Sequence, residues 1–115
     1  MKKAAIFLII TTLFFLPESL TADMGKQAYD RLCSSCHGAA GTGDGPVGKA
    51  LPPGLLPDLT TTKLKFATDD DKMKDLIIKG GAAAGLSPIM PPHPGIQGEE
   101  LDALIAYTKS LMRSE

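Results

Sequence analysis

The sequence lacks tryptophan, and its other aromatic residues are few, with 2 tyrosines and 4 phenylalanines among 115 residues. It also has only 2 cysteines. A short chain buries a modest apolar core, and small domains usually compensate with several disulfides or with a bound cofactor. One cysteine pair cannot supply several disulfides. The composition therefore favours a cofactor.

The sequence also lacks a strong excess of charge of either sign. It carries 12 basic and 13 acidic residues, for a formal net charge of −1. A nucleic-acid-binding surface calls for clustered lysine and arginine. Nucleic acid is therefore excluded as the expected partner.

No stretch alternates apolar and polar residues as a half-buried strand would, and no internal repeat is present. Helical patterns occur instead in three segments, about Met24–Ser34, Asp69–Lys79 and Glu99–Arg113. At the second segment, Thr68 and Asp71 resemble a capping box, and Gly80 marks the end. The sequence therefore predicts an all-α domain with about three main helices.

The segments between these helices are rich in glycine and proline. They run from His37 to Leu59 and from Gly80 to Gly98, and together they leave about half of the domain irregular. Loops this long in a compact domain are uncommon. We expect them to pack around a bound group.

The first residues have the pattern of an export signal. Lys2 and Lys3 precede an apolar run of thirteen residues, Ala4–Leu16, and Pro17 ends it. A membrane span needs about 20 apolar residues, so this run fits a signal-peptide core better. We predict a signal peptide at residues 1–22, cut after Ala22, and a periplasmic location. The alternative is an uncleaved N-terminal anchor, and in both cases the remaining chain is exported.

Residues 33–37, Cys-Ser-Ser-Cys-His, contain both cysteines and one of the 2 histidines. A thioredoxin-like redox pair would need a βαβ pattern around it, which the sequence does not show. A zinc site would need four ligands, and the other histidine is the distant His93. A disulfide across so short a loop would constrain the chain little. The remaining interpretation is covalent attachment of haem, which Cys-x-x-Cys-His indicates.

The spacing suits this interpretation. In a helical turn, positions i, i+3 and i+4 project from one face. The sulfurs of Cys33 and Cys36 can then bond to the two haem vinyl groups while His37 reaches the iron. We therefore predict one covalently attached haem c.

A soft ligand for the opposite face of the iron would be a methionine. Met24 lies too close to the attachment sequence, and Met73 and Met112 fall on apolar helical stripes that indicate core positions. Met90 follows His37 by 53 residues and lies in a proline-rich loop, which is long enough to reach the other face.

Pro91 and Pro92 stiffen the Met90 loop, because proline fixes φ and removes a donor. His93 is the rival ligand, since imidazole also binds haem iron. It lies between two prolines, so we interpret it as a haem-edge or surface residue. The predicted site consists of Cys33 and Cys36 as covalent attachment points and His37 and Met90 as axial ligands.

In order along the chain stand "CSSCHG", "GDGP", "PDLT", "MPPHPG" and "LDALIAYTKSL". With these segments the sequence resembles the class I c-type cytochromes, which are small exported single-haem proteins. The resemblance covers nearly all of residues 23–115, the expected cytochrome c domain. It implies an all-α cytochrome c fold with long loops wrapped around the haem. It also implies that the first and last helices cross through Gly25, Tyr29, Leu104 and Tyr107.

Two positions depart from the family pattern. His93 stands where an aromatic or apolar residue is more usual. The proline whose carbonyl should orient His37 is ambiguous among Pro46, Pro52 and Pro53, with a weak preference for Pro53.

The resemblance implies a single-electron carrier rather than an enzyme, because a haem iron with two axial ligands has no open position. Its expected partners are redox proteins of a periplasmic or respiratory chain, bound transiently by a monomer. One alternative is a haem c subunit held in a larger membrane oxidoreductase complex, with membrane contact through its partners or an uncleaved leader. Another is a sensor or peroxidase that releases Met90.

Overall fold

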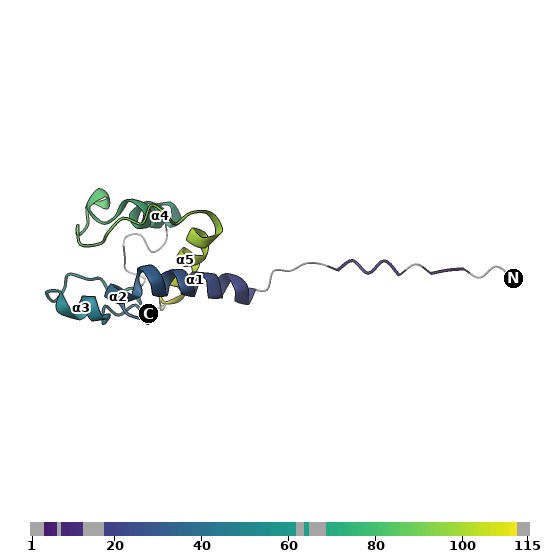
Figure 1. Cartoon of the computed structure of the whole chain (residues 1–115), viewed down its shortest axis with the longest axis horizontal. Helices are drawn as coiled ribbons and strands as arrows, with labels where there is room; N and C mark the ends of the chain where they lie inside the picture. Colours follow the sequence, from purple (N-terminus) through teal and green to yellow (C-terminus); the bar gives the residue numbers. More distant parts are fainter. Residues whose placement is uncertain (1–3, 7, 13–17, 62–63, 65–68, 113–115) are drawn as a thin grey trace.

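The structure is a computed structural model that describes residues 4–6, 8–12, 18–61, 64 and 69–112. Within these ranges it contains helices and no strand (Figure 1). The elements in chain order are α1 (Glu18–Leu32), α2 (Ser34–His37), α3 (Pro46–Ala50), α4 (Asp70–Lys79), the 3₁₀ turn η1 (Ala82–Ala84) and α5 (Gly98–Ser110). The predicted all-α class is confirmed.

The N-terminal segment extends away from the helical body (Figure 1). Four of its apolar side chains are 73–86% exposed: Ile6, Leu8, Ile9 and Ile10. The predicted cleavage position after Ala22 lies inside α1, and part of the predicted signal peptide lies outside the described residues. Among the helices of the described ranges, none is long and apolar enough to cross a membrane.

The helices α1 and α5 cross at a glycine. A Cβ atom at Gly25 would overlap the carbonyl oxygen of Ala103 and would lie 2.9 Å from the Cβ of Tyr107. Tyr29 and Leu104 are fully buried at this crossing, and the rings of Tyr29 and Tyr107 lie 5.3 Å apart at 55°. The expected crossing of the first and last helices is confirmed.

We expect Gly25→Ala to destabilise the protein by about 1–3 kcal/mol, because the added methyl group forces the two helix backbones apart. Alanine favours helix by up to about 1 kcal/mol, which offsets part of this cost. Chemical denaturation of the haem-loaded protein measures the difference. Gly95→Ala is the matched control, since a Cβ atom there meets nothing within 4 Å. Unchanged or increased stability of Gly25→Ala would contradict the close crossing.

The boundaries of the first helix differ from the prediction. Helix α1 begins at Glu18 rather than Met24, and it ends at Leu32 rather than Ser34. Cys33 has φ −121° and ψ −35°, outside regular helical geometry, although its N–H still donates to the Tyr29 carbonyl at 2.8 Å. The cysteine sequence therefore forms a separate turn.

Helix α4 matches its predicted range but has a different cap. The Asp69 carboxylate accepts a hydrogen bond from the Lys72 N–H at 3.0 Å, which makes Asp69 the N-cap. The predicted cap residue Thr68 lies outside the described residues. The helix ends as predicted at Gly80, whose φ of 85° suits glycine. Helix α5 ends at Ser110, and the predicted end at Arg113 also lies outside the described residues.

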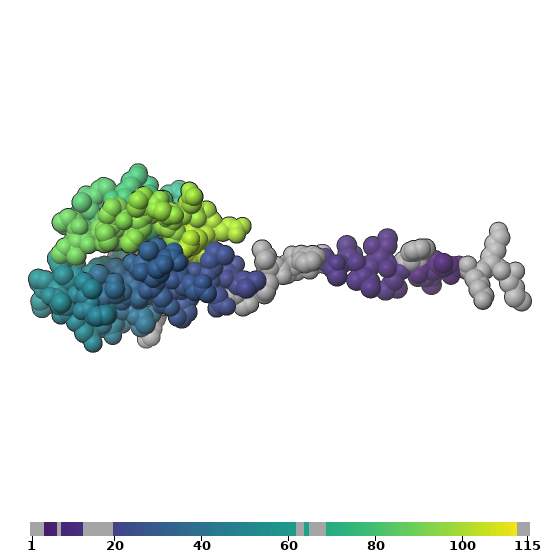
Figure 2. Space-filling view, viewed as in Figure 1, coloured from purple at the N-terminus to yellow at the C-terminus, as the bar shows by residue number. Residues whose placement is uncertain are grey.

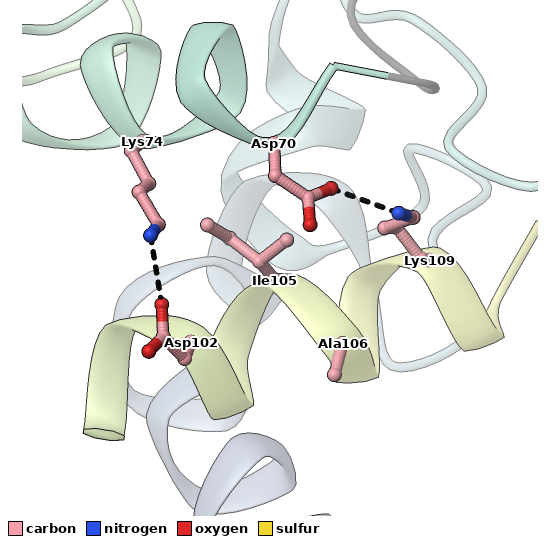
Figure 3. Close-up of a pocket in the computed structure, with 6 residues that line it drawn as sticks. All are labelled: Asp70, Lys74, Asp102, Ile105, Ala106 and Lys109. Carbon is pink, nitrogen blue, oxygen red and sulfur yellow. Dashed lines mark hydrogen bonds and ion pairs between the residues drawn. The ribbon is translucent and has the colours of Figure 1, made fainter. Parts of the chain in front are cut away.

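Two ion pairs join α4 to α5 (Figure 3). Lys74 pairs with Asp102 at 3.0 Å and Lys109 with Asp70 at 2.8 Å, on either side of the buried Ile105. They border a hollow of about 370 Å³. All four charged side chains are at least 38% exposed, so each pair contributes at most about 1 kcal/mol. The apolar contact of Ile105 therefore matters more for this packing.

The described helices form two halves. Helices α2 and α3 pack on each other and α2 packs on α1, whereas η1 packs on α4. Neither α2 nor α3 contacts α4 or η1. The space-filling view shows a narrow gap between the blue and teal half and the green half (Figure 2). We call this gap the cleft, and the predicted site residues lie in the segments on its two sides.

Candidate cofactor site

The predicted attachment residues share one helical turn. Cys33 is the N-cap of α2, and its carbonyl accepts hydrogen bonds from the N–H groups of Cys36 at 3.3 Å and His37 at 2.9 Å. Cys33, Cys36 and His37 therefore lie within one hydrogen-bonded turn, as their i, i+3, i+4 spacing predicts.

Both thiols are free and half-buried. Burial, with a smaller contribution from Cys36, raises the pKa of Cys33 to about 11. The Cys33 sulfur is therefore a neutral thiol near pH 7. Neither cysteine is part of a disulfide. Within the described ranges, no group of three or more His, Cys, Asp and Glu side chains is placed to hold a bare metal ion.

The His37 ring has an unsatisfied nitrogen. Its Nδ1 is buried and has no hydrogen-bond partner, and burial lowers the pKa of the ring. The ring is therefore held in its neutral form, which is the form that binds metals. An unpaired buried polar atom costs about 1–3 kcal/mol and calls for an explanation.

The expected proline contact to His37 is absent from the structure. A metal-binding histidine usually donates its second ring N–H to an acceptor. None of the three candidate carbonyls, those of Pro46, Pro52 and Pro53, accepts from Nδ1. Pro52 and Pro53 lie exposed after α3, and Pro46 begins that helix. The weak preference for Pro53 is therefore unsupported.

Helix α3 lies directly against the attachment turn, because two of the glycines that precede or form it have no side chain. A Cβ atom at Gly45 would overlap the carbonyl oxygens of Ser34 and Ser35, and one at Gly48 would overlap that of Cys36. The sequence pattern predicts an irregular loop for these glycines, so α3 is a difference from the prediction. The one available signal was Pro46, since proline is common in the first turn of a helix.

The Met90 loop is attached to the C-terminal end of α4. The Met90 carbonyl accepts from the Gly81 N–H at 3.0 Å, and a Cβ atom at Gly81 would lie 3.2 Å from the Met90 Cβ. The N–H of His93 donates to the Ile77 carbonyl at 2.9 Å. Both candidate ligands therefore belong to the α4 side of the cleft, whereas His37 belongs to the α2 side.

The methionines differ in their packing. Met73 is a buried member of the core cluster, and Met112 packs against it half-buried, as their helical stripes indicated. Met24 is exposed on α1. Met90 is half-buried against the core, although it lies in a loop. The choice of Met90 over His93 as ligand remains a prediction.

The residues present fit a covalently bound haem. One side of the cleft supplies two free thiols and a neutral histidine with a buried unpaired nitrogen. The other side supplies a half-buried thioether on a loop fixed by backbone contacts. Sulfur and imidazole are the side-chain groups that hold haem iron in cytochromes.

The comparisons with known proteins agree with this chemistry. A family model described as Cytochrome c matches residues 22–112. No curated protein and no solved structure matches the chain. Since the matched region covers most of the sequence, the chain belongs to the cytochrome c family.

Proposed function

We propose that this protein is an exported carrier of single electrons that works between redox proteins of a periplasmic chain. Members of the cytochrome c family bind haem and transfer electrons. The observation that carries the proposal is the free-thiol turn with its unpaired His37, on the opposite side of the cleft from the thioether of Met90.

In this proposal Cys33 and Cys36 hold one haem through thioether bonds, and His37 and Met90 are its axial ligands. The bound haem supplies reversible one-electron chemistry at its iron. Met90 favours the reduced state, because a thioether ligand raises the reduction potential. With His37 and Met90 both bound, no position remains for a substrate, which favours a carrier over a peroxidase or gas sensor.

A redox titration combined with carbon monoxide tests this function. We expect a single one-electron wave and an unchanged spectrum when carbon monoxide is added to the reduced protein, because Met90 occupies the sixth position. Some c-type domains belong to enzymes, and an enzyme with an open position would bind the gas. Rapid carbon monoxide binding would therefore contradict the carrier proposal. Isolation in a stable complex would instead support the oxidoreductase-subunit alternative.

The surface of the two halves suits brief contact with a partner. On α3 and on the loop before Met90, three large apolar side chains are exposed: Val47, Leu86 and Ile89. We propose that the monomer docks with α3 and this loop toward its redox partner. Fast release favours a small interface, below about 1,200 Å².

We expect the electron-transfer rate to fall only slightly as ionic strength rises. Strong steering needs a concentrated patch of one sign, and three lysines of α4 are paired with aspartates. The pairs are Lys72–Asp69 at 3.8 Å, Lys74–Asp102 at 3.0 Å and Lys79–Asp75 at 3.2 Å. Lys63 and Lys65, which complete a possible basic face, lie outside the described residues. Stopped-flow rates against a redox partner measure the dependence, and a steep fall would indicate a basic docking face instead.

A further inference from the structure

Tyr29 links the crossing of α1 and α5 to the backbone next to His37. Its hydroxyl donates to the carbonyl of Gly38 at 2.6 Å, and its ring packs against Tyr107 of α5. Tyr29 is fully buried and Gly38, which directly follows His37, is also buried. The hydrogen bond therefore joins the helix crossing to the Gly38–Ala39 peptide, one residue beyond the predicted iron ligand.

Hydrogen bonds of the backbone hold His37 on both sides. Its N–H donates to the Cys33 carbonyl at 2.9 Å, and its carbonyl accepts from the Gly43 N–H at 2.7 Å. The ring itself has no such restraint, because Nδ1 has no partner. A ligating histidine is usually oriented by an acceptor at that nitrogen. Here the orientation of the ring has to come from the backbone.

Packing alone does not explain why residue 29 carries a hydroxyl group. A phenylalanine ring would fill the same space against Tyr107, and a buried hydroxyl costs free energy unless it has a partner. Burial raises the pKa of Tyr29, with smaller contributions from neighbours that include Cys33. The phenol therefore stays a donor at any ordinary pH.

We propose that Tyr29 is a positioning residue, whose hydrogen bond to the Gly38 carbonyl fixes the backbone that follows His37 and so sets the orientation of the imidazole toward the iron. This inference rests on the proposed function, because it takes His37 as an axial ligand. It predicts that a hydrogen bond between α1 and the C-cap residue of α2 changes the reduction potential of the haem, although neither residue binds the iron.

The test compares Tyr29→Phe with Thr108→Val in the haem-loaded protein. Thr108 is a matched control, because its buried hydroxyl donates to the Leu104 carbonyl at 2.8 Å within α5. Both variants lose one buried hydrogen bond between a hydroxyl and a carbonyl. The readouts are the midpoint potential and the haem-methyl proton shifts of the ferric protein, which depend on the plane of the axial imidazole.

We expect Tyr29→Phe to shift both readouts, while Thr108→Val lowers the unfolding temperature and leaves both readouts at wild-type values. Wild-type readouts in Tyr29→Phe, or equal shifts in the two variants, would overturn the proposal. If Tyr29→Phe does not accumulate, the wild-type protein provides the test. Its Tyr29 hydroxyl proton should exchange slowly and show a nuclear Overhauser contact to the Gly38 region, and exchange at the solvent rate would overturn the inference.

The failure of this inference can be told apart from the failure of the proposed function. Haem that extracts freely into acid acetone from the wild-type protein would remove the proposed function and this inference together. Covalent haem with unmoved readouts in Tyr29→Phe would remove the positioning role alone.

Discussion

The double variant Cys33→Ala, Cys36→Ala should contain no covalent haem and should lose most of its helical circular dichroism. Tyr29 and Leu104 are the largest fully buried side chains in the described structure, so the protein core is small. Ordering each residue of the long loops costs about 1–2 kcal/mol of backbone entropy. Helices α2 and α3 do not contact α4 or η1, so a bound group in the cleft would join elements that otherwise do not pack on each other.

Two controls separate attachment from general damage to the turn. Ser35→Ala changes an exposed residue between the cysteines and should retain both haem and helix content. The single variants Cys33→Ala and Cys36→Ala should each weaken attachment, which extraction into acid acetone measures. Native-like helix content in the double variant would show that the protein core suffices without haem.

Met90→Ala should lose the sixth iron ligand, and this loss should lower the reduction potential and allow the reduced protein to bind carbon monoxide. The thioether favours ferrous iron, so its removal favours the ferric state. The weak near-infrared absorption expected of sulfur ligation to ferric iron should also disappear. Spectroscopy of the ferric protein and a redox titration measure these changes.

His93→Ala is the control for Met90→Ala, since both residues lie on one loop fixed to α4. The control variant should keep the near-infrared band and should not bind carbon monoxide. The reverse pattern, in which His93→Ala alone opens the iron, would show that the histidine is the ligand.

The sequence predicted those parts of the fold that depend on local pattern. Gly80 ended α4 as its position after Lys79 indicated. The crossing of the first and last helices at Gly25 is a long-range contact, and it was expected from the family resemblance rather than from local pattern. The short helix α3 was not predicted, because it depends on close backbone contact between Gly48 and Cys36. A contact of this kind leaves no apolar periodicity in the sequence. The helix break at Cys33 was not predicted either, because the conformation of a single residue does not change the apolar periodicity.

In the candidate site, too, local features were predicted and long-range contacts were not. The spacing of Cys33, Cys36 and His37 gave the local turn, because that turn depends on neighbouring residues. The unpaired Nδ1 and the hydroxyl bond of Tyr29 depend on how distant segments meet. The predicted hydrogen bond from His37 to a proline carbonyl is wrong for the same reason, because it depends on where a distant segment lies.

The crossing of α1 and α5 also determines the order in which the domain can assemble. Gly25 and Ala103 lie near opposite ends of the domain, so their contact closes a very long loop and forms only after most of the chain is present. During synthesis, Tyr29 has no partner helix until the last residues are made. In the proposed function, the segment with Cys33 and Cys36 would therefore stay accessible for haem attachment while most of the chain is still unfolded.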